Sequence, residues 1–291
     1  MWAVLTSMDF WKLAFLGSLV TVLGNLLAVY LKDVIAARSL ERWKIRQALD
    51  AVYDRYRRPI CMAAEELSGR CYTLAKAPEP WRKLVSLENT RLASSNSALG
   101  AEAGNLYFVY KILSDAYRLC CFLGWLELYR RDLGLMNVQS RQTGKALEDC
   151  IKKIRSDLAD GQLNFHPDWI NWRDFLIFRE EQRAIAHRMI AQSPSLGLID
   201  YGTFCEMLGS DSAGRWFTSA VQFFVEIGSD QDFRRTRMKL LVVHLTALRE
   251  LLQPGSVWPP HLKGSKQFED ELEAERRTVK GDLPRLALHK S

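Results

Sequence analysis

The longest uncharged run of the chain lies near its N-terminus. Its nineteen residues, from Leu13 to Leu31, read LAFLGSLVTVLGNLLAVYL. As an α-helix that rises about 1.5 Å per residue, the run would be about 28 Å long, close to the hydrocarbon thickness of a bilayer. The pattern predicts a transmembrane helix over 13–31, preceded by a short extracytoplasmic N-terminus over 1–12.

A buried core helix and a cleavable signal are the alternatives for this run. A signal would place a shorter apolar region behind a basic leader and would end at small residues. Here the leader carries only Asp9 and Lys12, and the run is followed by KDVI, which suits a continuing helix. These flanks favour a permanent anchor.

Basic residues are distributed unequally around the run, and this predicts its orientation. Only Lys12 precedes it, whereas eight Lys and Arg residues lie between Lys32 and Arg58. Because Lys and Arg are retained on the cytoplasmic side, we expect the N-terminus outside the cell membrane and the C-terminal part in the cytoplasm. The cluster would also attract anionic lipids. The lipid headgroup candidates are Arg42, Lys44, Arg46, Arg55, Arg57 and Arg58.

Small side chains form one strip of the predicted span. Gly17, Thr21, Gly24 and Ala28 recur at steps of four, three and four residues, with Asn25 beside them. In lipid, small residues let helices approach closely, and a polar side chain is better satisfied across a helix pair. The strip predicts a homo-oligomer formed through the span, whereas the competing interpretation is that small residues are generally frequent in membrane helices.

The rest of the chain places apolar residues three and four positions apart, with almost no alternation typical of strands. We therefore expect an all-α protein with one N-terminal transmembrane helix. A basic amphipathic juxtamembrane helix is predicted over 32–58, and a cytoplasmic helical bundle over 59–253, with Pro59 starting a new helix. The segment 254–291 is expected to be a flexible charged tail.

The strongest helical pattern within the bundle covers 104–133, which is apolar around nearly its whole circumference. Its longest uncharged run has eight residues, too few to cross a membrane, so we expect a central bundle helix. The segment 76–97, with its prolines and Ser/Asn cluster, is expected to be a loop. Further helices are predicted over 141–158, from Pro167 to 191, over 213–227 and over 233–252.

The cysteines fit a reducing compartment. Six Cys occur without a CxxC pair or zinc-like spacing, and the chain has no Asn-x-Ser/Thr glycosylation site. This combination favours buried, reduced thiols over a disulfide framework. The adjacent Cys120 and Cys121 are the one pair to test for redox chemistry.

The best catalytic candidate is a charged row within FREEQRAIAH. Glu180, Arg183 and His187 lie three and four residues apart and would share one helix face. Such a row could supply an acid, an orienting cation and a titratable imidazole. It lacks a nucleophile, an oxyanion-binding group and a metal-ligand pattern, so an intrahelical salt-bridge ladder is the competing interpretation.

No motif specifies a nucleotide, a metal or a covalent intermediate. The patterns GxxxxGK[ST], GxGxxG and GxSxG are absent, and we predict no cofactor. Trp169, Trp172, Phe175 and Phe178 could stack nucleic-acid bases. Because few basic residues accompany them, a core role is favoured and nucleic acid is a disfavoured partner.

Three segments carry a resemblance to other proteins. YDRYRRPICMAAEELSGRCYTL, GWLELYRR and FLIFREEQRAIAHRMI occur in this order after the apolar run. In this respect the chain resembles a set of uncharacterised bacterial helical proteins with an N-terminal membrane anchor. The resemblance implies a bacterial plasma membrane setting and no particular activity.

The pronounced patterns of this sequence concern anchoring and helix packing. We therefore expect a membrane-tethered interaction or signalling module, in contact with membrane lipids and with an unidentified protein partner. The alternative is a membrane-tethered helical enzyme that uses Glu180, Arg183 and His187.

Overall fold

The computed structural model of the chain is all-helical. It describes residues 8–76, 79, 106–134, 142–160, 175–191, 197–225, 227, 234–255, 270 and 274. No strand occurs in these ranges, and one isolated antiparallel bridge joins Ile190 to Leu198. The predicted all-α class is therefore confirmed.

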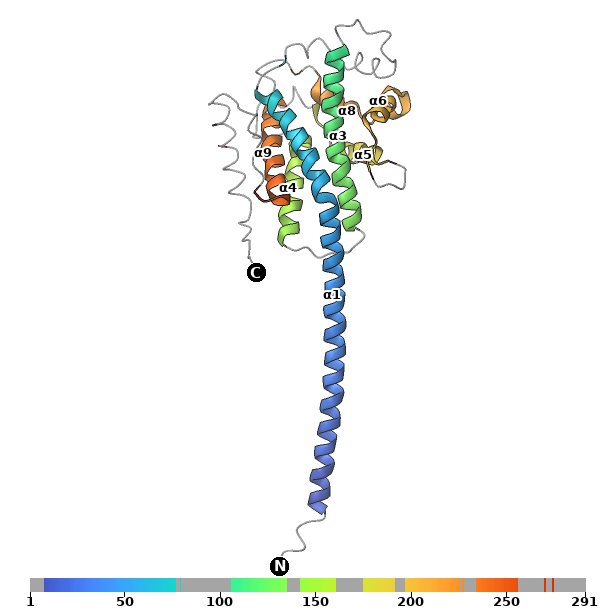
Figure 1. The fold of residues 1–291 in the computed structure, drawn as a ribbon, viewed down its shortest axis with the longest axis vertical. Coiled ribbons are helices and arrows are strands. Elements are labelled where there is room, and N and C mark those ends of the chain that lie inside the picture. Colours follow the sequence, from blue (N-terminus) through green and yellow to red (C-terminus); the bar gives the residue numbers. More distant parts are fainter. Residues whose placement is uncertain are drawn as a thin grey trace, which may run out of the picture. The chain divides into compact units, whose positions relative to one another are not determined.

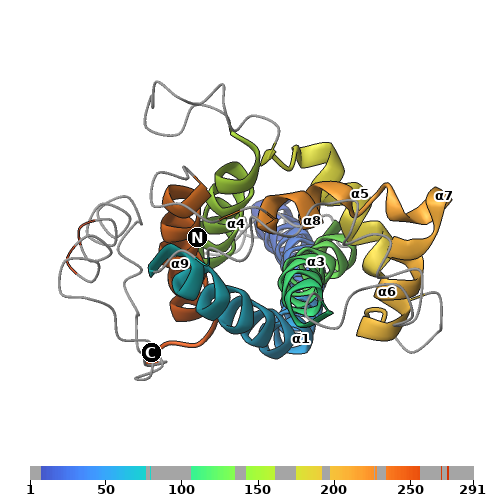
Figure 2. The same cartoon turned by 90° about the horizontal axis from the view of Figure 1, so that it is seen from above.

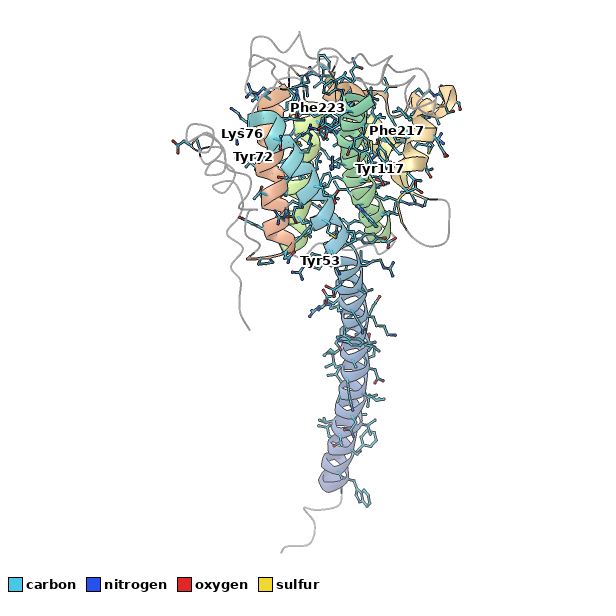
Figure 3. All side chains as sticks on the ribbon, turned by 45° about the horizontal axis from the view of Figure 1, so that its top comes forward. Tyr53, Tyr72, Lys76, Tyr117, Phe217 and Phe223 are labelled. Carbon is cyan, nitrogen blue, oxygen red and sulfur yellow. The ribbon has the colours of Figure 1, made fainter. Side chains whose placement is uncertain are left out.

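The structure divides into two units, Met1–Ala51 and Val52–Ser291. The first unit contains the N-terminal part of helix α1, Met8–Lys76 (Figure 1). This helix includes a segment long and apolar enough to cross a membrane. None of the most apolar stretch of 18 residues is buried in the structure. Figure 3 shows side chains that project from this part of α1. Leu16, Leu23 and Tyr30 are among its exposed residues. A core helix of a soluble protein would be covered.

Helix α1 continues through Pro59, where the sequence pattern predicted a new helix. A proline inside a helix removes one backbone hydrogen bond and costs about 3 kcal/mol. Tyr56 and Ile60, on either side of it, are both buried in the core of the second unit. Their burial offsets that cost and keeps the helix continuous. Val52 is buried as well, so the packed part of α1 begins before residue 59.

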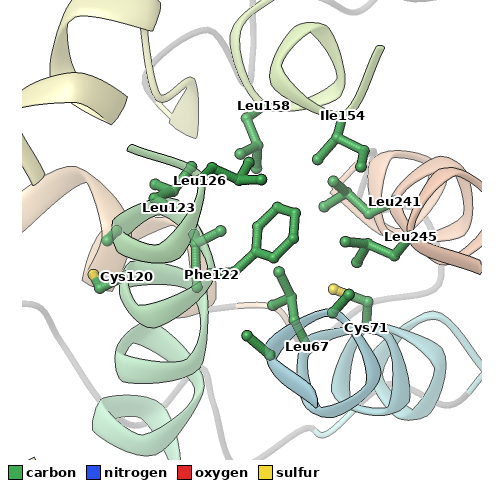
Figure 4. Close-up of a cluster of buried hydrophobic side chains, with 14 of the residues drawn as sticks. Leu67, Cys71, Cys120, Phe122, Leu123, Leu126, Ile154, Leu158, Leu241 and Leu245 are labelled. Carbon is green, nitrogen blue, oxygen red and sulfur yellow. The ribbon is translucent and has the colours of Figure 1, made fainter. Parts of the chain in front are cut away.

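The second unit packs the C-terminal part of α1 against three long helices. These are α3 (Leu106–Gly134), α4 (Gln142–Ala159) and α9 (Arg234–Leu252). Figure 4 shows Phe122 of α3 in the middle of their shared core, with Leu67 of α1, Leu158 of α4 and Leu241 of α9 around it. Burying each such side chain contributes about 1.5–3 kcal/mol. The prediction of a central helix over 104–133 agrees with the burial of α3.

Four shorter helices lie along the other side of α3 (Figure 2). They are α5 (Arg179–Met189), α6 (Tyr201–Gly209), α7 (Asp211–Gly214) and α8 (Thr218–Phe224). Gly124 of α3 allows α5 to approach closely, because a Cβ there would lie 3.1 Å from the Cβ of Met189. Tyr117 packs edge-on against Tyr201, and its hydroxyl donates to the backbone oxygen of Ile199 at 3.0 Å.

Two predicted helices are shorter than their sequence patterns indicate. Helix α5 begins only at Arg179, because the backbone of Phe178 is extended and its N–H donates to the Glu181 carboxylate at 2.8 Å. The helix predicted over 213–227 is broken by a turn between α7 and α8. That turn lets Phe217 pack edge-on against Phe204, at 5.0 Å between ring centroids.

Some predicted features lie outside the described residues. These are the helix start at Pro167, the residues Trp169 and Trp172, nearly all of the loop 76–97 and most of the tail 254–291.

Three arginines at the start of α9 bind the C-terminal ends of three other helices. Arg234 donates to the backbone oxygen of Val225 after α8, at 2.6 Å, and Arg235 donates to that of Ala75 in α1, at 2.7 Å. Arg237 donates to backbone oxygens at the end of α4. The last carbonyl groups of a helix lack partners within it and attract cations, so these contacts fix four helix ends at one place.

Candidate functional site: an arginine-rich surface around Glu127 and His187

His187 of α5 contacts a residue that the sequence analysis did not consider. Its Nε2 atom lies 3.0 Å from Oε1 of Glu127 on α3. The Glu127 side chain is only 4% exposed, whereas that of His187 is 59% exposed. The pair thus joins a buried carboxylate to an imidazole that faces solvent. Since 60 positions separate the two residues, no local spacing could reveal it.

Glu127 also binds Arg130, one helical turn further along α3. The Arg130 Nε donates to Oε2 at 2.8 Å, and its Nη2 donates to Oε1 at 2.5 Å. Burial would raise the pKa of Glu127, but the hydrogen bonds from Arg130 and His187 outweigh it and lower that pKa below its ordinary value. The Glu127 carboxylate is therefore ionised near neutral pH, and both of its oxygen atoms accept hydrogen bonds.

Arg155 of α4 is held in place by a buried amide. Its Nε donates to Oε1 of Gln182 at 3.1 Å, and the Gln182 Nε2 donates to the backbone oxygens of Arg155 and Ile177, at 3.0 and 2.8 Å. Gln182 is 1% exposed. The amide oxygen of Gln182 is a neutral acceptor, so this hydrogen bond orients the Arg155 guanidinium without forming an ion pair.

Two further arginines of α5 lie within electrostatic reach of Arg155. Burial, together with the positive charges of Arg183, Arg179 and Arg130, lowers the pKa of Arg155 despite the opposing effect of Glu127. Arg179 donates to Oγ of Ser156 at 2.8 Å. The exposed Arg183 forms no ion pair with any described residue.

We call these five side chains the arginine-rich surface: Arg130, Arg155, Arg179, Arg183 and His187. They come from three helices, α3, α4 and α5. Such a group can bind an anion, since guanidinium groups donate several parallel hydrogen bonds to oxyanions.

The predicted row is therefore only partly present. Glu180, Arg183 and His187 all lie on α5. Neither Glu180 nor Arg183 is ion-paired to His187 within the described ranges, where Glu127 takes that place. No hydroxyl or thiol of a described residue is hydrogen-bonded to His187. Glu127, Arg130, Arg155 and Gln182 are the site residues that sequence reasoning missed.

A second histidine pair is fully enclosed between α4 and α9. The His244 Nδ1 lies 2.6 Å from Oδ2 of Asp157, and both side chains are buried. Burial raises the pKa of Asp157 in spite of the hydrogen bond from His244 and the nearby Arg237. The pair is therefore much less accessible to a ligand than His187.

The cysteines are poorly suited to redox chemistry. Burial raises the pKa of Cys120 well above its ordinary value and that of Cys121 to about 11. The thiolate is the reactive form of cysteine, so both thiols are unreactive near neutral pH. No cluster of His, Cys, Asp or Glu in the described ranges is arranged to hold a metal ion.

The other predicted site residues are distributed between the two units. In the first unit, a Cβ added at Gly17 or Gly24 would meet nothing within 4 Å, and Thr21 donates to the backbone oxygen of Gly17. Five other predicted site residues of the first unit are exposed: Asn25, Ala28, Arg42, Lys44 and Arg46.

In the second unit, Arg58 is exposed, Arg57 is half-buried and Arg55 forms an ion pair with Asp132 at 3.2 Å. The ring of Phe175 is covered by the guanidinium of Arg234, 3.8 Å from the ring centroid, and Phe178 is exposed.

The comparisons with known proteins identify no relative of this chain. No protein family, curated protein or solved structure matches the chain.

Proposed function

We propose that the protein is a single-pass membrane protein whose second unit serves as a cytoplasmic interaction or signalling module. The observation that carries this proposal is the exposure of the apolar part of α1. Apolar side chains over such a length are stable in lipid and unfavourable in water. The basic residues that follow the run favour a cytoplasmic second unit.

A tether is useful to a module that acts on membrane-bound partners. Fixing the module at one surface raises its effective concentration toward other molecules on that surface. The packed second unit offers the arginine-rich surface to such a partner. The basic residues after the run would add attraction to anionic lipids of about 1 kcal/mol each.

The enzyme alternative rests on one specific contact, that between Glu127 and His187. A buried carboxylate that orients an exposed imidazole is the arrangement of many general bases. A substrate would have to bring the reacting group, since no nucleophile of the described residues contacts the imidazole. An activity abolished by His187→Ala in a protein that still folds would favour this alternative.

The anchor is tested by alkaline carbonate extraction of membranes from cells that express the full chain. We expect the full-length protein in the membrane pellet. A variant with Leu19→Arg and Leu23→Arg should move to the soluble fraction, because each central arginine disfavours insertion by about 2.5–3.5 kcal/mol. Release of the parent chain, or a mature form that starts near Asp33, would contradict the proposal.

Orientation is tested by protease treatment from one side of the membrane. Protease added outside intact cells should leave the second unit uncut, and disruption of the membrane should expose it. Cleavage of the second unit in intact cells would reverse the proposed topology.

A further inference from the structure

We infer that the arginine-rich surface is a binding site for a phosphate monoester dianion, with Arg155 and Arg183 as its principal ligands. The inference concerns only residues of the second unit and does not depend on the proposed anchor.

The first observation is an excess of positive charge at one place. Arg155 is hydrogen-bonded to Gln182 and contacts the Arg179 backbone oxygen on α5, and Arg183 follows Gln182 directly on that helix. Arg130 also lies within electrostatic reach of Arg155. Glu127 is already occupied by Arg130 and His187. Burial lowers the pKa of Arg155, and repulsion from the other positive charges lowers it as well. An anion bound between these charges would relieve the repulsion.

The second observation is that nearby acidic groups do not cancel this charge. Asp160 lies 3.8 Å from Arg179, a long contact between two half-exposed side chains. Glu181 is engaged by the Phe178 N–H at the start of α5. Within the described ranges, Glu180 forms no ion pair with Arg183 although it lies three residues before it. Of the acidic groups, Glu127 acts on Arg155, and it is already hydrogen-bonded to Arg130 and His187. Arg183 forms no ion pair within the described ranges.

The third observation is preorganisation. Gln182 is buried and fixes the Nε side of the Arg155 guanidinium, which leaves the other nitrogen atoms of that group to a ligand apart from a long contact, 3.5 Å, to the Arg179 backbone oxygen. The buried Glu127 likewise orients Arg130 and His187 through hydrogen bonds. Side chains that are already ordered lose little conformational entropy when a ligand binds.

The donor set favours phosphate over carboxylate. A carboxylate offers two oxygen atoms and one charge, whereas a phosphate monoester offers three terminal oxygens and nearly two charges at neutral pH. Guanidinium groups bind phosphate oxygens bidentately, and an exposed imidazole supplies one more donor when protonated. The monoester could belong to a soluble metabolite or to a lipid headgroup.

The test uses the full-length protein in neutral detergent and two probes. Isothermal titration calorimetry with inorganic phosphate measures a soluble ligand. Flotation with phosphatidylcholine vesicles, with and without phosphatidic acid, measures a lipid headgroup. Saturable binding in either arm is the expected result, and the arm that responds identifies the source.

Variants locate the binding. Arg183→Gln, at an exposed position, and Arg155→Gln should each weaken binding about tenfold or more, as expected for loss of a charge-assisted hydrogen bond. Lys145→Gln is the matched control, since it removes the same charge from an exposed position about 15 Å before Arg155 on α4. It should bind like the parent.

Three results would overturn the inference. The first is an absence of binding in both arms. The second is an equal loss in the Lys145→Gln control, which would mean general charge attraction. The third is unchanged binding by Arg183→Gln, whose thermal unfolding should match that of the parent. Failure of membrane anchoring in the carbonate experiment would leave this site unaffected, so the two proposals fail separately.

Discussion

Arg235 of α9 donates two hydrogen bonds to the backbone oxygen of Ala75, in the last turn of α1. Its Nη2 lies 2.7 Å and its Nε 3.2 Å from that oxygen. Arg234 and Arg237 make the same kind of contact to the ends of α8 and α4. Helix ends far apart in the sequence are thus held together by a single segment of α9, and this arrangement predicts how the second unit responds to mutation.

Arg237 is the most buried of the three arginines, at 1% exposed. We predict that Arg237→Met lowers the free energy of unfolding by about 2 kcal/mol or more, because backbone oxygens at the end of α4 lose charged donors. Denaturant titration followed by circular dichroism measures the change. Glu250→Met is the control at an exposed position of α9 and should stay within about 0.5 kcal/mol. Equal stability of Arg237→Met and the parent would contradict a stabilising role for the hydrogen bonds from Arg237 to the end of α4.

The Glu127 carboxylate predicts a dependence of stability on acid pH. Its pKa is lower in the folded chain than the ordinary value of about 4.3. The stabilisation it contributes is therefore fully present above that ordinary value and is lost as the pH falls through the lower folded pKa. Glu127→Gln should be less stable than the parent at pH 7, and the difference should shrink on acidification.

Thermal unfolding at a series of pH values measures this difference. Glu180→Gln, an exposed position without an ion pair in the described ranges, is the control and should follow the parent at every pH. If the gap between parent and Glu127→Gln stayed constant down to strongly acid pH, the carboxylate would not be ionised in the fold as described.

The small-residue strip of α1 predicts self-association in the membrane. Changing Gly17, Gly24 and Asn25 to leucine fills the strip without a clash inside one chain, since a Cβ at either glycine meets nothing within 4 Å. We expect the triple variant to remain in the membrane and to crosslink into dimers less than the parent. A leucine-to-isoleucine change at Leu19 keeps the strip intact and is the control. Equal crosslinking of all three proteins would exclude the strip from assembly.

The adjacent Cys120 and Cys121 are expected to react slowly with thiol reagents. Because burial raises the pKa of Cys121 to about 11 and that of Cys120 well above its ordinary value, both thiols should react with maleimide at pH 7 far more slowly in the folded than in the denatured protein. Mass spectrometry of the labelled peptides measures the rates. Ser212→Cys, at an exposed position, should label rapidly in the folded state and shows that the reagent is active. A disulfide formed between the adjacent cysteines in the native protein would refute this prediction.

The sequence by itself determined the features that depend on local pattern. An uncharged run of nineteen residues can satisfy its own backbone only as a helix, and its length follows from the rise per residue. The apolar character of 104–133 on all faces likewise required burial, and most apolar side chains of α3 are buried, although Tyr107 and Tyr110 are exposed. The all-α class followed from apolar spacing in the same way.

Only the tertiary structure decided where these patterns meet. Pro59 indicates a helix start when only its neighbours are considered, yet burial of Tyr56 and Ile60 keeps α1 unbroken. His187 lies on one helix with Glu180, yet its partner is Glu127 on another. The strength of a local signal comes from spacing along a single helix, whereas contacts between helices depend on which faces pack. That choice is made by the sum of many apolar contacts around Phe122, and no short segment of the chain contains it.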